Sequence, residues 1–139
     1  MKRRAVAGRA ASFATTGLAC LVLMAGVLPA RSAEPTAWYS GEYKSCDQDT
    51  TPEIVRCITS LTAGWEARLE TALKALLAQQ TAKQQERLKA SQKAWTAFRD
   101  ADCAFYVNGE GTIARVEGAE CRRVLTQQRA QELEQAGRP

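Results

Sequence analysis

Histidine is absent from the 139 residues of this sequence, and aromatic residues are scarce at 6%. Without histidine, a Ser-His-Asp or Cys-His catalytic site is excluded, and so are a histidine-ligated zinc site and a histidine-based pH switch. Few aromatic residues allow only a modest hydrophobic core. The sequence is therefore that of a small protein whose function does not depend on imidazole chemistry.

Long apolar runs are also scarce, and the main one is Leu18–Leu28. It is shorter than the roughly 20 residues that a membrane-spanning helix needs. Basic residues precede it and the small-residue segment Pro29–Ala33 follows it, which is the order of a secretory signal peptide. We therefore predict a cleaved signal peptide over residues 1–33, a single exported domain over residues 34–139 with no membrane span, and a periplasmic or secreted location.

An excess of basic residues is confined to that N-terminal segment. The whole sequence has a formal charge of +4, but residues 1–33 hold five basic residues and no acidic one. Residues 34–139 keep 14 basic and 15 acidic residues, which is a formal charge of −1. The predicted domain therefore has no cationic excess to favour nucleic acid or an anionic membrane surface.

Motifs for catalysis are missing as well. The carboxylates lie on segments with helical character, where a solvated charge is the ordinary state, and the sequence has no nucleophile motif, phosphate-binding loop or C-x-x-C pair. We predict no catalytic residues, no cofactor and no enzymatic activity.

The predicted domain does contain an even set of cysteines, namely Cys46, Cys57, Cys103 and Cys121. Such a set in a short exported chain is typical of disulfides. The intervening gaps of 10, 45 and 17 residues do not resemble the paired knuckles of a four-thiolate zinc site. We predict two disulfides, each worth about 2–4 kcal/mol, and no metal site.

Helix-forming residues dominate the domain, and no proline occurs from residue 53 to residue 138. Thr50–Glu53 has the spacing of a capping box, and apolar residues then recur at steps of three and four from Ile54 to Leu76. A second capping-box spacing at Thr81–Gln84 predicts a turn near residues 79–83. These patterns predict an irregular arm over residues 34–49 followed by a first helix that ends at this turn.

A second and a third helix follow. The second is expected to end at Asn108–Gly109. The third, capped by Thr112, is expected to run through Leu133 with an irregularity at Gly118, and residues 135–139 are expected to form a frayed tail. The predicted fold is all-α: a small antiparallel three-helix bundle with an irregular N-terminal arm, cross-linked by two disulfides. The side of the second helix that we interpret as its core face carries Leu88, Ala94, Trp95, Phe98, Ala101 and Phe105.

The connectivity of this bundle brings all four cysteines to one end. We prefer the pairing of Cys57 with Cys103 and of Cys46 with Cys121. The alternative, Cys46 with Cys57 and Cys103 with Cys121, stays open because a sequence alone does not fix disulfide connectivity.

The segment Leu88–Cys103 reads LKASQKAWTAFRDADC. It resembles the L-K-x-x-Q-x-x-W-x-x-[FY]-R-D-x-x-C signature of the LprI-like lysozyme inhibitor domain family, which consists of small exported bacterial proteins. The resemblance covers about residues 46–134, although the middle of the first helix lacks a tyrosine that is common in the family. Further matching pieces are Thr51-x-Glu53-Ile54 with Cys57, Gly109-x-Gly111-Thr112, and Cys121-x(4)-Thr126-x-x-Arg129-x-x-Glu132-Leu133.

The resemblance implies a protein partner, lysozyme, whose activity the protein blocks. Most residues of the motif are expected to be structural: Trp95 and Phe98 in the core, and Arg99 four residues after Trp95, within reach of a cation–π contact. Asp100 or Asp102 is expected to pair with Arg99 or Arg129. The motif set is Gln92, Trp95, Phe98, Arg99, Asp100 and Arg129.

The candidate binding element is the loop between the second and third helices. It consists of Asn108, Gly109, Glu110, Gly111 and Thr112, and it could enter the substrate cleft of a lysozyme. The simpler interpretation is an ordinary helix connection that needs glycine. A different class of function is a structural or interaction module of the cell envelope, for which Trp38, Tyr39 and Tyr43 would have to be exposed; we expect them to fold over the bundle instead.

Overall fold

The computed structural model describes Trp38, Tyr39 and residues 41–138, and the predicted signal peptide lies outside these residues. The described part contains a short 3-10 helix, η1 (Gly41–Cys46), and three long α-helices: α1 (Thr51–Ala78), α2 (Ala82–Val107) and α3 (Ile113–Ala136). No strand occurs in this part of the chain, so the all-α prediction is confirmed. None of these helices is both long and apolar enough to cross a membrane.

The helix starts differ in how they are capped. At α2 the predicted capping box is present, because the Thr81 hydroxyl accepts from the Gln84 backbone N–H and the Gln84 side chain accepts from the Thr81 N–H. At α1 the Thr50 hydroxyl instead donates to the Glu53 carboxylate at 2.6 Å and makes no bond to the backbone. Thr112 has helical φ and ψ and makes no side-chain capping bond either. Only one of the three predicted caps, Thr81, therefore makes the side-chain capping bond.

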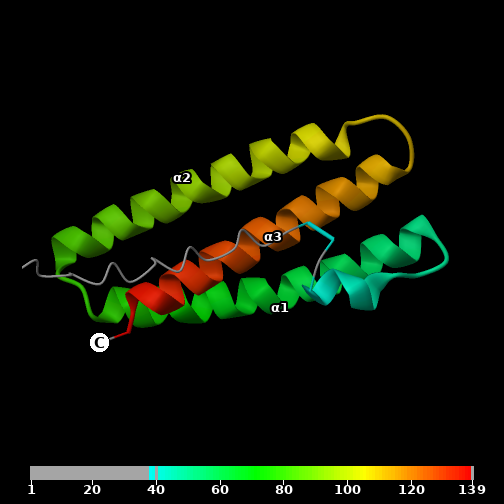
Figure 1. Ribbon diagram of the computed structural model, residues 1–139. Coiled ribbons are helices and arrows are strands. Elements are labelled where there is room, and N and C mark those ends of the chain that lie inside the picture. The colour runs from blue at the N-terminus through cyan, green and yellow to red at the C-terminus, as the bar shows by residue number, and fades with distance from the viewer. Residues whose placement is uncertain (1–37, 40, 139) are drawn as a thin grey trace, which may run out of the picture. The chain divides into compact units, whose positions relative to one another are not determined.

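Helix α3 is the central element of the described unit. It packs along α1 on one side and along α2 on the other, whereas α1 and α2 make few contacts with each other (Figure 1). The chain runs one way in α1, returns in α2 and reverses again in α3, as predicted. The bundle is thus held together through α3.

The core lies mainly between α1 and α3. Its larger cluster joins the buried side chains of α1 to Ala130 and Leu133 of α3, while Leu88 and Trp95 of α2 pack against its edge. Burying a leucine side chain fully contributes about 1.5–3 kcal/mol to the free energy of folding, because its apolar surface is removed from water. The periodicity from Ile54 to Leu76 therefore identified the core face of α1, whose buried members in this cluster are Trp65, Leu69, Ala72 and Leu76.

Only part of the predicted core face of α2 lies against the core: Leu88 and Trp95 pack there, whereas Ala94 and Ala101 are exposed. Phe98 and Phe105 are 56% and 77% exposed, so the prediction that Phe98 packs in the core is wrong. The residues that turn toward α3 include Arg99 and Cys103, both of which are buried. Apolar residues occur on both sides of α2, and the disulfide and Arg99 determine which side faces inward.

The disulfides join Cys46 to Cys57 and Cys103 to Cys121, with Cα atoms 5.4 and 5.5 Å apart. The preferred pairing of Cys57 with Cys103 and Cys46 with Cys121 is therefore wrong, and the alternative is correct. The physical reason is the position of α3: because α1 and α2 make few contacts with each other, their cysteines bond to η1 and α3 instead.

Candidate functional site

One end of the described unit brings together η1, the start of α1, the end of α2 and the start of α3 (Figure 1). Both disulfides lie there, and we call this end the disulfide pole. Two exposed loops extend from it: residues 47–50 before α1, and residues 108–112 between α2 and α3. All five residues of the candidate binding loop, residues 108–112, are therefore exposed at the disulfide pole.

The loop at residues 108–112 has a defined shape. The Asn108 side-chain amide donates to the Ala104 carbonyl at 2.7 Å, and the Gly109 N–H donates to the Tyr106 carbonyl at 3.0 Å. Gly111 has φ = +76°, a conformation that favours glycine. The disulfide at Cys103 ties the helix before the loop to the helix after it. The start of the loop is therefore anchored to the end of α2, and the helices on its two sides are tied to each other.

The pole carries exposed carboxylates on both loops. Asp47 and Asp49 precede α1, and Glu110 lies between the two glycines of the second loop. Exposed Lys44 and Arg56 lie on the neighbouring helices, so the pole is mixed in charge. It can recognise a basic protein surface through individual contacts more than through a long-range field.

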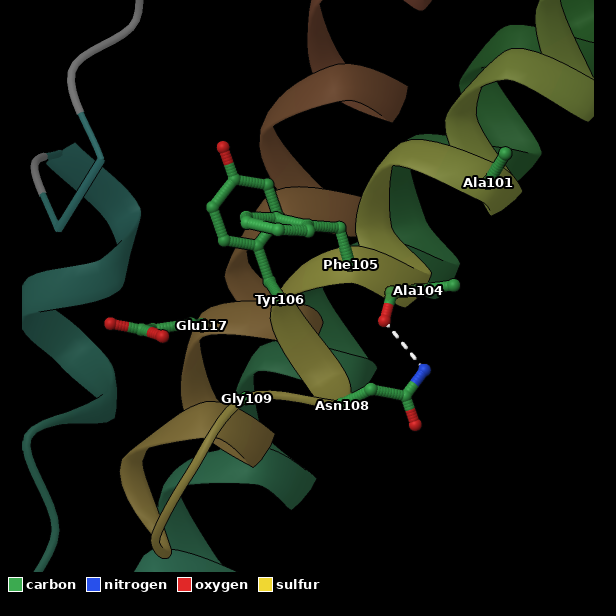
Figure 2. A pocket seen from close by; sticks show the side chains of 7 residues that line it. All are labelled: Ala101, Ala104, Phe105, Tyr106, Asn108, Gly109 and Glu117. Carbon is green, nitrogen blue, oxygen red and sulfur yellow. Dashed lines mark hydrogen bonds between the residues drawn. The ribbon is translucent and has the colours of Figure 1, made fainter.

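A hollow of about 600 Å³ adjoins the loop. Figure 2 shows that it combines the end of α2 with the start of the loop and with Glu117 of α3. The rings of Phe105 and Tyr106 meet edge to face there, with centroids 5.2 Å apart. Sequence reasoning missed this hollow because it assigned Phe105 to the core. Its lining residues are Ala101, Ala104, Phe105, Tyr106, Asn108, Gly109 and Glu117.

Most of the signature residues form a polar cluster between the helices. The Arg99 side chain, only 10% exposed, donates from Nη1 to the Thr126 hydroxyl at 3.2 Å and from Nε to the Asp100 carboxylate at 3.1 Å. Its guanidinium lies 5.2 Å from the centre of the Trp95 ring, and Glu66 of α1 lies 3.4 Å from Nη1. Arg99 therefore connects all three helices.

Arg129 of α3 completes this cluster. Its Nε donates to the Gln92 amide oxygen at 3.1 Å, Nη1 pairs with Glu132 at 3.1 Å, and its guanidinium lies 6.0 Å from the centre of the Trp95 ring. The structure brings Gln92, Trp95, Arg99 and Arg129 together and leaves Phe98 exposed on another side of α2.

The electrostatics of Asp100 reflect this cluster. Partial burial by itself raises the pKa of the Asp100 carboxyl, but the hydrogen bonds and positive charges of Arg99 and Arg122 outweigh it and hold the pKa below its ordinary value. Arg122 lies 2.8 Å from the same carboxylate oxygen. Asp100 is thus a charged partner for two arginines, and nothing in its surroundings suits it for proton transfer near neutral pH.

Sequence reasoning did not find the second polar cluster, which attaches the N-terminal arm. Glu120 and Arg123 of α3 form an ion pair at 2.7 Å with side chains 0% and 1% exposed. The Tyr39 N–H also donates to the Glu120 carboxylate at 3.1 Å, and Arg123 lies 3.7 Å from Glu42. The spacing of three between Glu120 and Arg123 is the one available signal, but on a polar helix it reads as a surface pair.

The described arm lies against the pole. Tyr43 packs against the cluster of Cys46, Ile58 and Val116, and its ring centroid is 4.8 Å from that of Tyr39. The Trp38 ring lies tilted against the Tyr106 ring, with centroids 4.7 Å apart, while Tyr39 stays 38% exposed. Burial raises the pKa values of the Tyr39 and Tyr43 hydroxyls, and Glu117 adds to the rise for Tyr39.

One group of candidate metal ligands occurs among the described residues. Asp102, Cys103 and Cys121 have their ligand atoms within 4.8 Å of one another. The two sulfurs are joined as a disulfide and therefore supply no thiolate for a metal ion.

Comparison with known proteins adds the family. No curated protein and no solved structure matches the chain. Residues 42–133, more than half of the sequence, match the family described as lysozyme inhibitor LprI. The matched segment runs from η1 almost to the end of α3 and includes both disulfides and the polar cluster around Arg99. With this fold and this match, the chain belongs to the LprI lysozyme inhibitor family.

Proposed function

We propose that the protein is an exported inhibitor that binds a lysozyme through the disulfide pole and blocks its substrate cleft. The family consists of inhibitors, which is consistent with a protein that is not an enzyme. The two disulfides fit an oxidising compartment, the periplasm or the exterior. The observation that carries the proposal is the exposed loop at residues 108–112, whose start is bonded to α2 and whose flanking helices are joined by the Cys103–Cys121 disulfide.

The loop suits a cleft because it is narrow and already ordered. A lysozyme cleaves glycan chains in a groove between two carboxylic acids, and a loop that fills the groove excludes the glycan. Little conformational entropy is lost on binding when the loop is fixed beforehand. Two glycines keep the tip free of bulky side chains, so its backbone can approach the floor of the groove.

The charges at the disulfide pole also favour binding of this end of the protein to a lysozyme. Lysozymes are basic proteins, and Asp47, Asp49 and Glu110 are exposed where the pole would meet the rim of the cleft. With a formal charge of −1 over residues 34–139, long-range steering is weak. The carboxylates therefore act through short-range pairing at the rim.

The experiment measures lysis of a bacterial cell-wall suspension by several lysozymes, with and without oxidised protein purified after export. We expect protection by the wild type, and a rise of about tenfold or more in the half-inhibitory concentration for Glu110→Lys, equivalent to about 1.4 kcal/mol. The matched control is Glu70→Lys, an exposed carboxylate on α1 with a side chain 72% exposed. Absence of protection at micromolar excess over every lysozyme would contradict the proposal.

A second candidate is an envelope interaction module without activity against lysozyme. The observation that favours it is the exposed apolar side of α2. This side has no contact to make when the loop alone blocks a cleft. Under this alternative, Glu110→Lys and the wild type would both leave lysis unchanged.

A further inference from the structure

We propose that the outward side of α2 is a self-association surface through which two copies of the chain pair antiparallel. Phe98 and Phe105 stand out of this side, 56% and 77% exposed. Alanines surround them, and all but the partly buried Ala104 are exposed. We call this surface the Ala–Phe face; it consists of Ala90, Ala94, Ala97, Phe98, Ala101, Ala104 and Phe105.

The face is unusual for the outer side of a helix in a small domain. Helix α3 covers the opposite side of α2, where Arg99 and Cys103 are buried. An outer side with no other function carries charged and polar residues. Here the outer side is apolar for about four turns, which is typical of a surface that another protein covers.

The residues of the face repeat every seven positions, as in a coiled coil. Ala90, Ala97 and Ala104 form one series, Ala94 and Ala101 a second, and Phe98 and Phe105 a third. Each series therefore runs along one line of the helix. This repeat is the pattern that lets two helices pack side by side over their length.

The pattern is complementary to itself in one antiparallel register. When Phe98 lies level with Ala101 of the second copy, Phe105 lies level with Ala94 of the second copy, and both relations occur twice by symmetry. Every large side chain then meets a small one. A parallel pairing would put Phe98 against Phe98 and Phe105 against Phe105, which leaves gaps at the alanines.

The hollow beside the loop provides the receiving space in this register. Its α2 wall consists of the small side chains Ala101 and Ala104 and of the rings of Phe105 and Tyr106 (Figure 2). Phe98 of the second copy arrives level with Ala101, where the small side chains leave room for a ring. The hollow of about 600 Å³ is thus the place where an aromatic side chain of the partner would be seated.

Charge also selects the antiparallel arrangement. Exposed Arg87 precedes the Ala–Phe face and exposed Glu110 follows it. Two antiparallel copies bring Arg87 of one close to Glu110 of the other at both ends of the interface. A parallel pair would place like charges together, which is unfavourable. This complementarity is the reason to assign the face to a second copy and not to an unrelated protein or a membrane.

Such a pair would hold its two disulfide poles at opposite ends. The inference does not depend on lysozyme binding, because the interface is defined by α2 and tested by mass. Glu110 has a prospective contact in both proposals, whereas Phe98 and Arg87 lie outside the loop and separate them.

The test is sedimentation equilibrium of the oxidised protein purified after export. We expect twice the chain mass for the wild type, and a rise of at least about 30-fold in the dissociation constant for Phe98→Asp, the effect of removing a central aromatic anchor. Ser60→Asp, on the exposed side of α1, is the control and is expected to leave the dissociation constant unchanged. Circular dichroism checks that each variant is folded.

The register has its own test. Arg87→Glu and Glu110→Arg are each expected to weaken the pair, and the double variant to recover most of the loss. A single-copy mass for the wild type at its highest soluble concentration would overturn the proposal. So would a pair that persists in Phe98→Asp, or a monomer in which Phe98→Asp abolishes binding to lysozyme or to anionic vesicles, because the face would then serve that other partner.

Discussion

At the scale of single residues, Glu120 and Arg123 are the polar groups that the fold holds most tightly. The Glu120 carboxylate accepts from Arg123 Nη2 at 2.7 Å, from Arg123 Nε at 2.8 Å and from the Tyr39 N–H at 3.1 Å. Taking two charges out of water is costly unless the geometry is good and the remaining sites are bonded. The pair meets that condition and, through Tyr39, fixes the arm to α3.

Arg123 and its neighbour Arg122 offer a matched comparison. Arg123→Ala leaves the fully buried Glu120 carboxylate without its partner, so we expect the free energy of unfolding to fall by about 3–5 kcal/mol. Arg122 is 42% exposed and pairs with half-exposed Asp100, so Arg122→Ala is expected to cost about 1 kcal/mol or less. Urea denaturation of both variants measures the difference; equal costs would show that burial is not the controlling factor.

The polar clusters around Arg99 and around Glu120 show how much of a residue's environment can be predicted from the sequence. The contact of Arg99 with Trp95 was predictable, since residues four apart on a helix are neighbours. The burial of Glu120 was not, because the Tyr39 backbone that covers it is far away in sequence. The exposure of Phe98 was not predictable either, because a hydrophobic residue gives no sign of which helix face a disulfide will turn inward.

At the scale of helices, Gly118 determines how closely α2 and α3 approach each other. Helix α3 is continuous through Gly118, so the predicted irregularity there is wrong. A Cβ atom at residue 118 would lie 2.7 Å from Val107 Cβ and 3.0 Å from Val107 Cα. The glycine therefore serves close packing at the end of α2, next to the Cys103–Cys121 disulfide.

Gly118→Ala and Gly64→Ala are expected to change stability in opposite directions. Gly118→Ala forces α2 away from α3, and we expect a loss of about 1–3 kcal/mol from overpacking. At Gly64, in the middle of α1, nothing lies within 4 Å of an added Cβ. Gly64→Ala is therefore expected to gain about 0.5–1 kcal/mol from helix propensity. Thermal and urea unfolding report both; a stabilising Gly118→Ala would contradict the packing argument.

The sequence predicted the helices well and their rotation poorly. The Thr81 capping box and the Ile54–Leu76 periodicity located α1 and α2 because both signals are local. Disulfide pairing and the inward face of α2 depend on which helix lies in the middle, and no local pattern carries that information. The loop at residues 108–112 was predictable from Asn108 and Gly109, whereas the adjoining hollow depends on the exposure of Phe105.

At the scale of the whole described unit, stability is unevenly distributed. Helix α1 has six buried residues and α3 has ten, but α2 has only Arg99 and Cys103. Both of these lie in the second half of α2, and the disulfide to Cys121 lies there as well. The first half of α2 has partly buried Leu88 at the edge of the core, and Trp95 packs there at the middle of the helix. Local opening therefore costs least at the start of α2.

Hydrogen exchange followed by mass spectrometry should show this gradient. We expect amides of residues 82–92 to exchange faster than those of residues 99–107, and α3 to exchange slowest, because opening energies range from about zero at weakly packed segments to the global value in the core. The paired variant Cys103→Ala/Cys121→Ala removes the covalent tie at the far end of α2. In that variant residues 99–107 should lose protection while α1, packed against α3, keeps most of its own. Uniform protection along α2 in the wild type, or loss of protection spread equally over all three helices in the variant, would mean that the unit opens only as a whole and that α2 is not an independently weak element.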